Sequence, residues 1–329
     1  MTTNLYYHGP TSDHFDGVRF FNPGLPTTDR GLADLLRWRI SGKRAPWPDS
    51  LECLQVVPAG RADALTVTMV GHASLLIQVA GRNMLVDPVW SERASPLQWA
   101  GPRRTTAPGI AFDKLPPIDV VLLTHNHYDH LDVPTLQRLW DQHHPRIVAP
   151  LGNDNVIHKS APTIVVETGD WEQSFDFGTG LLARIVPANH WSARAMGDRR
   201  MALWGGFVIT TPDASVYVAG DTGYGDGRIF RDIRQTHGSV DLAILPIGAY
   251  APRWFMKDQH ADPDEAVQIM IDCGARQAIG VHWGTFQLTD EARRAPKEGL
   301  IASLARRGMS ANSFVALEPG DVWTNSSQM

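Results

Sequence analysis

Short apolar segments bounded by glycine, proline and other turn residues recur along the chain from residue 65 onward. This pattern predicts a series of β-strands. The first three segments are separated by Gly71 and Gly81, which indicates a meander of neighbouring strands. Strands are expected over residues 65–70, 75–79, 83–86, 118–123, 147–149, 164–167, 181–187, 207–211, 215–219, 242–245, 278–281 and 314–317.

Segments with helical periodicity alternate with the later strands. Helices are expected over residues 133–142, 153–159, 227–235, 263–273 and 291–306. Two mixed sheets packed face to face, with these helices outside, would bury all the apolar faces. The sequence therefore predicts an α/β (α+β) fold, an αββα sandwich forming one domain over residues 65–329. Because no short internal repeat is found, solenoids and propellers are not expected.

Residues 1–64 are rich in proline, glycine and aromatic residues and lack strand alternation, so we expect an N-terminal extension. One helix is predicted within it, over residues 32–40, with Thr28 and Asp29 before it as a cap. Its leucines share one face, and we expect the helix to pack on the core. The alternative is that the side carrying Trp38 and the arginines faces a membrane or a partner.

Composition narrows the class of protein. Hydrophobic residues make up 43% and charged residues 20%, which is typical of a soluble globular protein. The net charge of −5, without a long basic run, argues against a nucleic-acid partner. The only two cysteines, Cys53 and Cys273, are far apart and predict neither a disulfide nor a thiolate metal site. With no signal sequence and no membrane-spanning run, we expect a cytoplasmic protein, with peripheral contact at the inner membrane face left open.

The segment T-H-N-H-Y-D-H-L-D, residues 124–132, follows directly on a buried strand. His125 and His127 are two residues apart on extended backbone, so both can reach one metal ion. Asp129 and His130, after the turn, can reach a second ion nearby. Imidazole and carboxylate donors without thiolate suit zinc, and they also accommodate iron or manganese. A polar loop with a chance cluster of histidines does not account for this spacing.

Three later residues each stand just beyond the end of a predicted strand: His190, Asp221 and His282. Any one of them alone would more often be a hydrogen-bonded structural residue. Because loops at strand ends can converge on one site, the set predicts a single metal centre. His72 and Asp87 follow strands in the same way, and we expect them to orient ligands rather than to bind metal.

Several segments extend the pattern beyond the histidine cluster: V-G-H-A-S (70–74), D-P-V-W-S-E-R-A-S-P (87–96), G-P-R-R (101–104), L-P-P-I-D (115–119), N-H-W-S-A-R (189–194), G-D-T-G-Y (220–224), I-G-A-Y-A-P-R-W-F-M-K (247–257) and H-W-G-T-F (282–286). Together with His125-x-His127-x-Asp129-His130, they resemble the N-acyl-phosphatidylethanolamine-hydrolysing phospholipases D of the metallo-β-lactamase fold. The resemblance covers about residues 65 to 290.

This resemblance implies two Zn²⁺ ions per chain. His125, His127, His190 and Asp221 would hold one, and Asp129, His130, His282 and the shared Asp221 would hold the other. It implies hydrolysis of a phospholipid phosphodiester by a metal-bridging hydroxide, which releases phosphatidate and an N-acylethanolamine. It also suggests a homodimer.

Asp129 and His260 are the expected catalytic residues. His260 matches a family position and would assist the scissile group or the leaving oxygen; alternatively, it caps a helix and packs. The Trp254–Met256 segment and the face of Leu35, Leu36 and Trp38 are candidates to line a lipid groove.

Other functions fit the same ligand set. A lactonase or ester hydrolase of the sugar-phosphate lactonase type would direct the hydroxide at carbon. A nuclease would need a basic surface, which the net charge argues against. A non-enzymatic scaffold would be expected to have lost ligands, and a di-iron redox protein would need iron.

Overall fold

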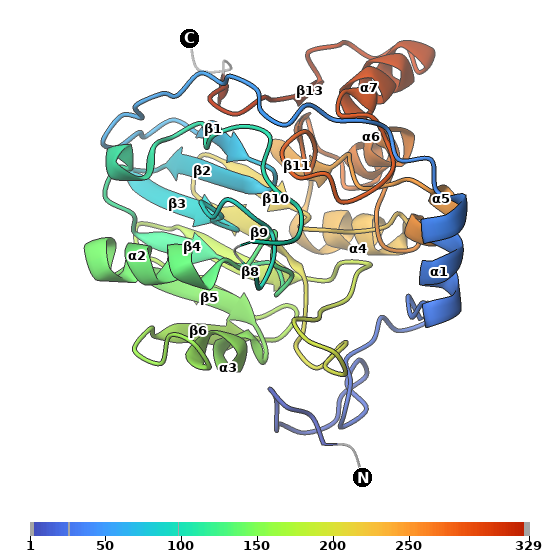
Figure 1. Ribbon diagram of the computed structural model, residues 1–329. Coiled ribbons are helices and arrows are strands. Elements are labelled where there is room, and N and C mark those ends of the chain that lie inside the picture. The colour runs from blue at the N-terminus through green and yellow to red at the C-terminus, as the bar shows by residue number, and fades with distance from the viewer. Residues whose placement is uncertain (1–2, 26, 98, 326–329) are drawn as a thin grey trace.

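The computed structural model describes residues 3–25, 27–97 and 99–325. Two seven-stranded mixed sheets form the centre of the molecule (Figure 1). The first sheet has the order β14 (Val322–Thr324), β1 (Thr66–Gly71), β2 (Ser74–Val79), β3 (Arg82–Val86), β4 (Val120–Leu122), β5 (Arg146–Pro150) and β6 (Val166–Gly169). The second has the order β13 (Phe314–Ala316), β12 (Gln277–Val281), β11 (Leu242–Pro246), β10 (Ser215–Val218), β9 (Gly206–Thr210), β8 (Leu182–Val186) and β7 (Ser174–Asp176).

The main apolar core lies between the two sheets. Leu75, Ile77 and Val86 of the first sheet are fully buried in one cluster with Phe207 and Ile244 of the second. Along β2 and β3, alternate residues face this core because successive side chains of a strand point to opposite faces. This packing confirms the predicted pair of face-to-face sheets.

Helices cover both outer faces of the sandwich. On the first sheet lie η1 (Phe112–Lys114), α2 (Val133–His143) and α3 (Asn153–His158). On the second lie α4 (Arg228–His237), α6 (Pro263–Asp272) and α7 (Ala295–Arg306), as Figure 1 shows. Each helix buries one apolar face, such as Leu136 and Leu139 of α2 or Val267 and Met270 of α6. The αββα architecture is therefore confirmed.

The sequence pattern missed four short elements: η1, β7, β14 and α5 (Arg253–Met256). Each has only three or four residues, which is too short for a period to be recognised. The last helix begins at Ala295, four residues later than predicted from Glu291, with a proline in its first turn. Proline is favoured at that position because its fixed φ suits the start of a helix.

The N-terminal extension crosses the surface of the domain and carries α1 (Leu32–Ser41), which lies beside α5 in Figure 1. The helix contacts the domain through Trp38, whose ring lies 4.9 Å from that of Phe255 and whose Nε1 donates to Asp290 Oδ2. Leu32, Leu36 and Ile40 point outward, with 86%, 59% and 77% of their surface exposed, so the leucine face does not pack on the core as expected. Among the described residues, no helix has both the length and the hydropathy needed to span a bilayer.

Candidate metal centre

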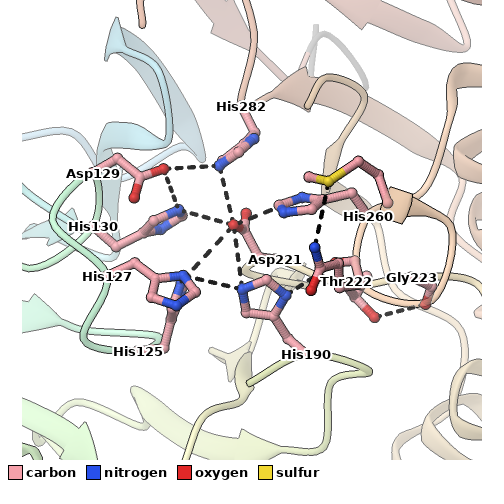
Figure 2. Close-up of polar contacts among 12 residues, drawn as sticks. His125, His127, Asp129, His130, His190, Asp221, Thr222, Gly223, His260 and His282 are labelled. Atoms are coloured by element: carbon pink, nitrogen blue, oxygen red, sulfur yellow. Dashed lines mark hydrogen bonds and ion pairs between the residues drawn. The ribbon is translucent and has the colours of Figure 1, made fainter. Parts of the chain in front are cut away.

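Four strand ends of the two sheets deliver polar side chains to one place. The segment after β4 carries His125 to His130, and His190, Asp221 and His282 follow β8, β10 and β12. Because β10, β11 and β12 run parallel, their carboxyl ends lie at the same edge of the sheet. Figure 2 shows the predicted ligands turned toward Asp221. All seven residues predicted from the sequence therefore come together.

The first group of donors contains His125, His127, His190 and Asp221. His127 Nδ1 lies 3.0 Å from His125 Nε2 and 3.3 Å from His190 Nε2. Asp221 Oδ2 is 3.8 Å from His125 Nε2 and 3.7 Å from His190 Nε2. Three ring nitrogens and one carboxylate oxygen thus surround a small space, as the ligands of a single cation do.

The second group places Asp129, His130 and His282 on the other side of Asp221. Asp221 Oδ2 lies 3.0 Å from His282 Nε2 and 3.3 Å from His130 Nε2. Asp129 Oδ2 is 3.1 Å from His282 Nε2 and 3.5 Å from His130 Nε2. Asp221 stands between both groups (Figure 2), which is the position of a carboxylate shared by two cations.

The residues fit a metal centre on chemical grounds. His130 Nε2 and Asp221 Oδ1 are buried and make no hydrogen bond within the described chain. Unsatisfied buried polar atoms are rare and costly, and cations would satisfy these ones. Nitrogen and oxygen donors in this mixture suit zinc and several other divalent ions.

Burial and charge set different protonation states for the histidines of the two groups. Burial lowers the pKa of His127 and of His190 to about 3, so both imidazoles are neutral at pH 7. Burial would also lower the pKa of His282, but the Asp221 and Asp129 carboxylates outweigh it and raise that pKa to about 9. The metal-free site therefore holds protons near its carboxylates, and bound cations would displace them.

Further residues hold the ligands in place. Asp87 accepts hydrogen bonds from Thr124 N at 2.8 Å and from Thr124 Oγ1 at 2.6 Å, and its Oδ2 lies 2.7 Å from His130 Nδ1. The carbonyl oxygen of Gln259 lies 3.0 Å from His190 Nδ1. Contacts of this kind fix which ring nitrogen faces the metal and how the ring is turned. Asp87 occupies the orienting place that the sequence suggested.

His260 lies at the same centre without belonging to either four-donor group. Its Nδ1 is 3.9 Å from Asp221 Oδ2, and its ring centroid is 5.1 Å from that of His190. With Asp221 and His282 it forms a third set of donors that are close enough to share an ion. Burial lowers its pKa well below the ordinary value, so the imidazole is neutral at pH 7. His260 is therefore a neutral imidazole beside the donor cluster.

A pocket of about 390 Å³ opens on this centre. It is lined by Arg30, Leu35, Trp38, Ala94, His127, Tyr128, Asp129, Trp191, Arg199, Asp221, Phe255, Met256, Gln259, His260 and Leu288. Part of its wall was anticipated, namely Leu35, Trp38, Phe255 and Met256, whereas Leu36 and Trp254 do not line it. No sequence pattern pointed to Arg30, Arg199 or Leu288, because only the path of the extension and the neighbouring loops brings them here.

Comparison with known proteins agrees with this geometry. Residues 82–283 match the family model of the beta-lactamase superfamily domain. N-acyl-phosphatidylethanolamine-hydrolyzing phospholipase D 1 of Caenorhabditis elegans is 36% identical over 80% of this chain and 76% of its own length. The mitochondrial yeast enzyme of that name is 34% identical over 71% of this chain and 50% of its own length.

The chain belongs to the beta-lactamase superfamily, alongside the N-acyl-phosphatidylethanolamine-hydrolysing phospholipases D. It is a metal-dependent hydrolase. Solved structures support the fold of this superfamily: the isothiocyanate hydrolase from Delia radicum gut bacteria superposes with a TM-score of 0.63 at 19% identity, over 79% of this chain and 100% of its own. Igni18, a metallo hydrolase of Ignicoccus hospitalis, gives 0.59 at 18% identity, over 80% and 100%.

Proposed function

We propose that this superfamily member is a dinuclear zinc phosphodiesterase that hydrolyses N-acyl-phosphatidylethanolamine to phosphatidate and an N-acylethanolamine. The observation that carries the proposal is the pocket that joins the ligand cluster to an apolar wall of Leu35, Trp38, Phe255, Met256 and Leu288. An apolar wall beside charged donors suits a substrate that has both a phosphate and a hydrocarbon chain. The named activity of the nematode and yeast relatives supports the same substrate class.

Each residue of the centre has a defined part in this proposal. His125, His127 and His190 would hold one Zn²⁺, Asp129, His130 and His282 the other, and Asp221 both. When bound, the two cations supply hydroxide near neutral pH and offset negative charge on the phosphoryl oxygens. His260, neutral and facing the pocket, would donate a hydrogen bond to the leaving oxygen or the scissile phosphate. Arg30 and Arg199 would add positive charge near the phosphate, although Asp258 and Asp29 pair with them.

A substrate comparison tests the proposal. The zinc-loaded protein is incubated with N-acyl-phosphatidylethanolamine, with bis(p-nitrophenyl) phosphate and with a lactone, and the products are identified by mass spectrometry. We expect phosphatidate and N-acylethanolamine in a one-to-one ratio, with His127→Ala inactive and the exposed-site control His144→Ala fully active. Preferential turnover of the lactone would replace the phospholipase proposal with the lactonase alternative.

Metal analysis tests the cofactor separately from the substrate. Two zinc ions per chain are expected after purification without chelator, and one fewer for each group of ligands that is removed. A bound iron content with its optical absorption band would contradict zinc as the metal.

We further propose that α1 brings the pocket to a membrane surface. Leu32, Leu36 and Ile40 project outward, and Arg37, Arg39 and Lys43 lie on or beside the same helix. Helices that expose apolar and basic side chains together can bind anionic lipid interfaces, and the exposed side chains of α1 have this combination. Vesicle sedimentation of a variant with serine at these three apolar positions should show reduced binding, whereas serine at the exposed Leu54 and Val57 should have no effect.

A further inference from the structure

One buried histidine beside the second ligand group has no role in the proposed function. His72 directly follows β1, and only 1% of its surface is exposed. Its Nε2 lies 2.9 Å from Asp129 Oδ2, closer than the nitrogen of His282 at 3.1 Å or of His130 at 3.5 Å. His72 is therefore the nearest imidazole to a carboxylate that is expected to bind metal.

The backbone holds His72 firmly in this place. Its φ is 58°, a left-handed conformation that residues other than glycine adopt at a cost. Its amide donates to Thr285 Oγ1 at 2.9 Å, and its carbonyl accepts from the amide of His282 at 2.8 Å. His282 also has a positive φ, 63°. The two histidines are thus fixed against each other where the two sheets meet.

The role of His72 follows from the hydrogen bonds that the Asp129 carboxylate receives. Within the described chain, the Asp129 side chain receives hydrogen bonds from His72 and His282 only. Metal binding uses the Nε2 lone pair of His282, and that nitrogen then carries no proton to donate. His72 Nε2–H becomes the one protein donor left to orient the Asp129 carboxylate.

Other ligands of the centre have such partners already. His130 contacts Asp87, His190 contacts the carbonyl of Gln259, and Thr124 Oγ1 lies 3.0 Å from His125 Nδ1. We propose that His72 is the corresponding positioning residue of Asp129: its Nε2–H donates to Oδ2 and sets the carboxylate for the second metal ion. This inference rests on the proposed two-metal centre.

Positioning accounts for the geometry better than direct coordination does. His72 lies close enough to Asp129, His130 and His282 to share an ion with them. With Asp221, however, the second group already offers four protein donors without His72. A fifth protein ligand would occupy a coordination position that a hydrolase needs for water and for the substrate oxygen.

The consequence is a selective loss of the second metal. Replacing an orienting partner of a metal ligand typically weakens affinity about 10- to 100-fold. His72→Leu removes the donor and should have an effect of that size at the second site, with the first site unchanged. His72→Gln can place an amide N–H close to the position of Nε2 and should restore most of the affinity. His72→Asn tolerates a positive φ but is too short to reach Asp129, and should behave like His72→Leu.

The experiment titrates metal-free protein with Zn²⁺ against a competing chelator, and with Co²⁺ while absorption reports coordination. Melting temperatures of the metal-free variants check that each one folds. His144 provides a matched control, because it is an exposed histidine that also has a positive φ, of 48°. His144→Leu and His144→Gln introduce the same chemical changes at a left-handed position and should bind both ions as the wild type does.

Two outcomes would overturn the inference. If His72→Leu and His72→Asn keep wild-type affinity at both sites, Asp129 needs no donor from His72. If His72→Gln loses the second ion as fully as His72→Leu does, His72 acts as a direct ligand. Failure of the proposed function looks different, because the wild type itself would then bind fewer than two ions or leave the phospholipid intact.

Discussion

At the scale of single residues, side chains outside the predicted ligand set hydrogen-bond to the ligand segment. Asp87 is 1% exposed, and its two oxygens serve Thr124 and His130. When His130 Nε2 binds a cation, its Nδ1 must carry a proton and needs an acceptor. The Asp87 side chain supplies that acceptor and also anchors the start of the ligand segment.

Asp87→Asn should therefore weaken zinc binding about 10- to 100-fold. If the asparagine amide nitrogen faces His130, it cannot accept a hydrogen bond from His130 Nδ1. If the amide is turned the other way, its nitrogen faces the Thr124 amide and one hydrogen bond from Thr124 is lost. Zinc retained after dialysis against a graded chelator series measures the effect. Asp141→Asn, at an exposed position on α2, is the control, and equal retention in both variants would refute the role of Asp87.

At the scale of elements, the start of α6 fixes the loop that carries His260. Asp262 Oδ1 accepts from the amides of Asp264 at 3.0 Å and Glu265 at 2.9 Å, and Glu265 Oε2 accepts from the Asp262 amide at 3.1 Å. This capping box satisfies free N–H groups in the first turn. The amide of Ala261, between His260 and the cap, donates to the Thr222 carbonyl at 2.8 Å.

Asp262→Ala should lower the free energy of unfolding by about 1 kcal/mol, because the cap is lost. Asp262→Asn keeps a capping oxygen and should retain most of the stability. Urea denaturation of the metal-free protein compares the two. Equal destabilisation would assign the effect to the Asp262–Arg253 contact, at 3.5 Å, instead of to the cap.

At the scale of the whole molecule, the extension is tied to the domain through a buried histidine. His14 Nδ1 lies 2.6 Å from Asp13 Oδ1, its Nε2 lies 2.7 Å from Asp170 Oδ1, and its ring stacks on Trp171. Burial alone would lower the pKa of His14, but Asp170 and Asp13 outweigh burial and raise it. The protonated form therefore holds the extension on the domain.

Stability should reflect this titration with a definite sign. Because the pKa of His14 is raised in the folded state, its contribution to the free energy of unfolding is fully present below the unfolded-state pKa of about 6.5. This contribution disappears as the pH rises through the folded-state pKa. The difference in unfolding free energy between wild type and His14→Gln should thus be largest at acidic pH and shrink toward alkaline pH. A difference that grows with pH would contradict the assigned charge state.

Patterns in the sequence alone predicted the architecture and the candidate metal ligands. Strand and helix periods predicted the sandwich, because long apolar faces must be buried against each other. The spacing of His125, His127, Asp129 and His130 predicted a metal site, because local geometry already brings such residues together. Strand ends added His190, Asp221 and His282.

Which distant groups meet depends on the tertiary structure. The contact of His72 with Asp129, the place of Arg199 in the pocket and the outward leucine face of α1 depend on how the two sheets, the loops and the extension pack. Such contacts join residues far apart in sequence, and no local period or spacing encodes them. For the same reason the short elements β7, β14 and α5 escaped prediction: neighbouring strands and loops stabilise them, not their own pattern.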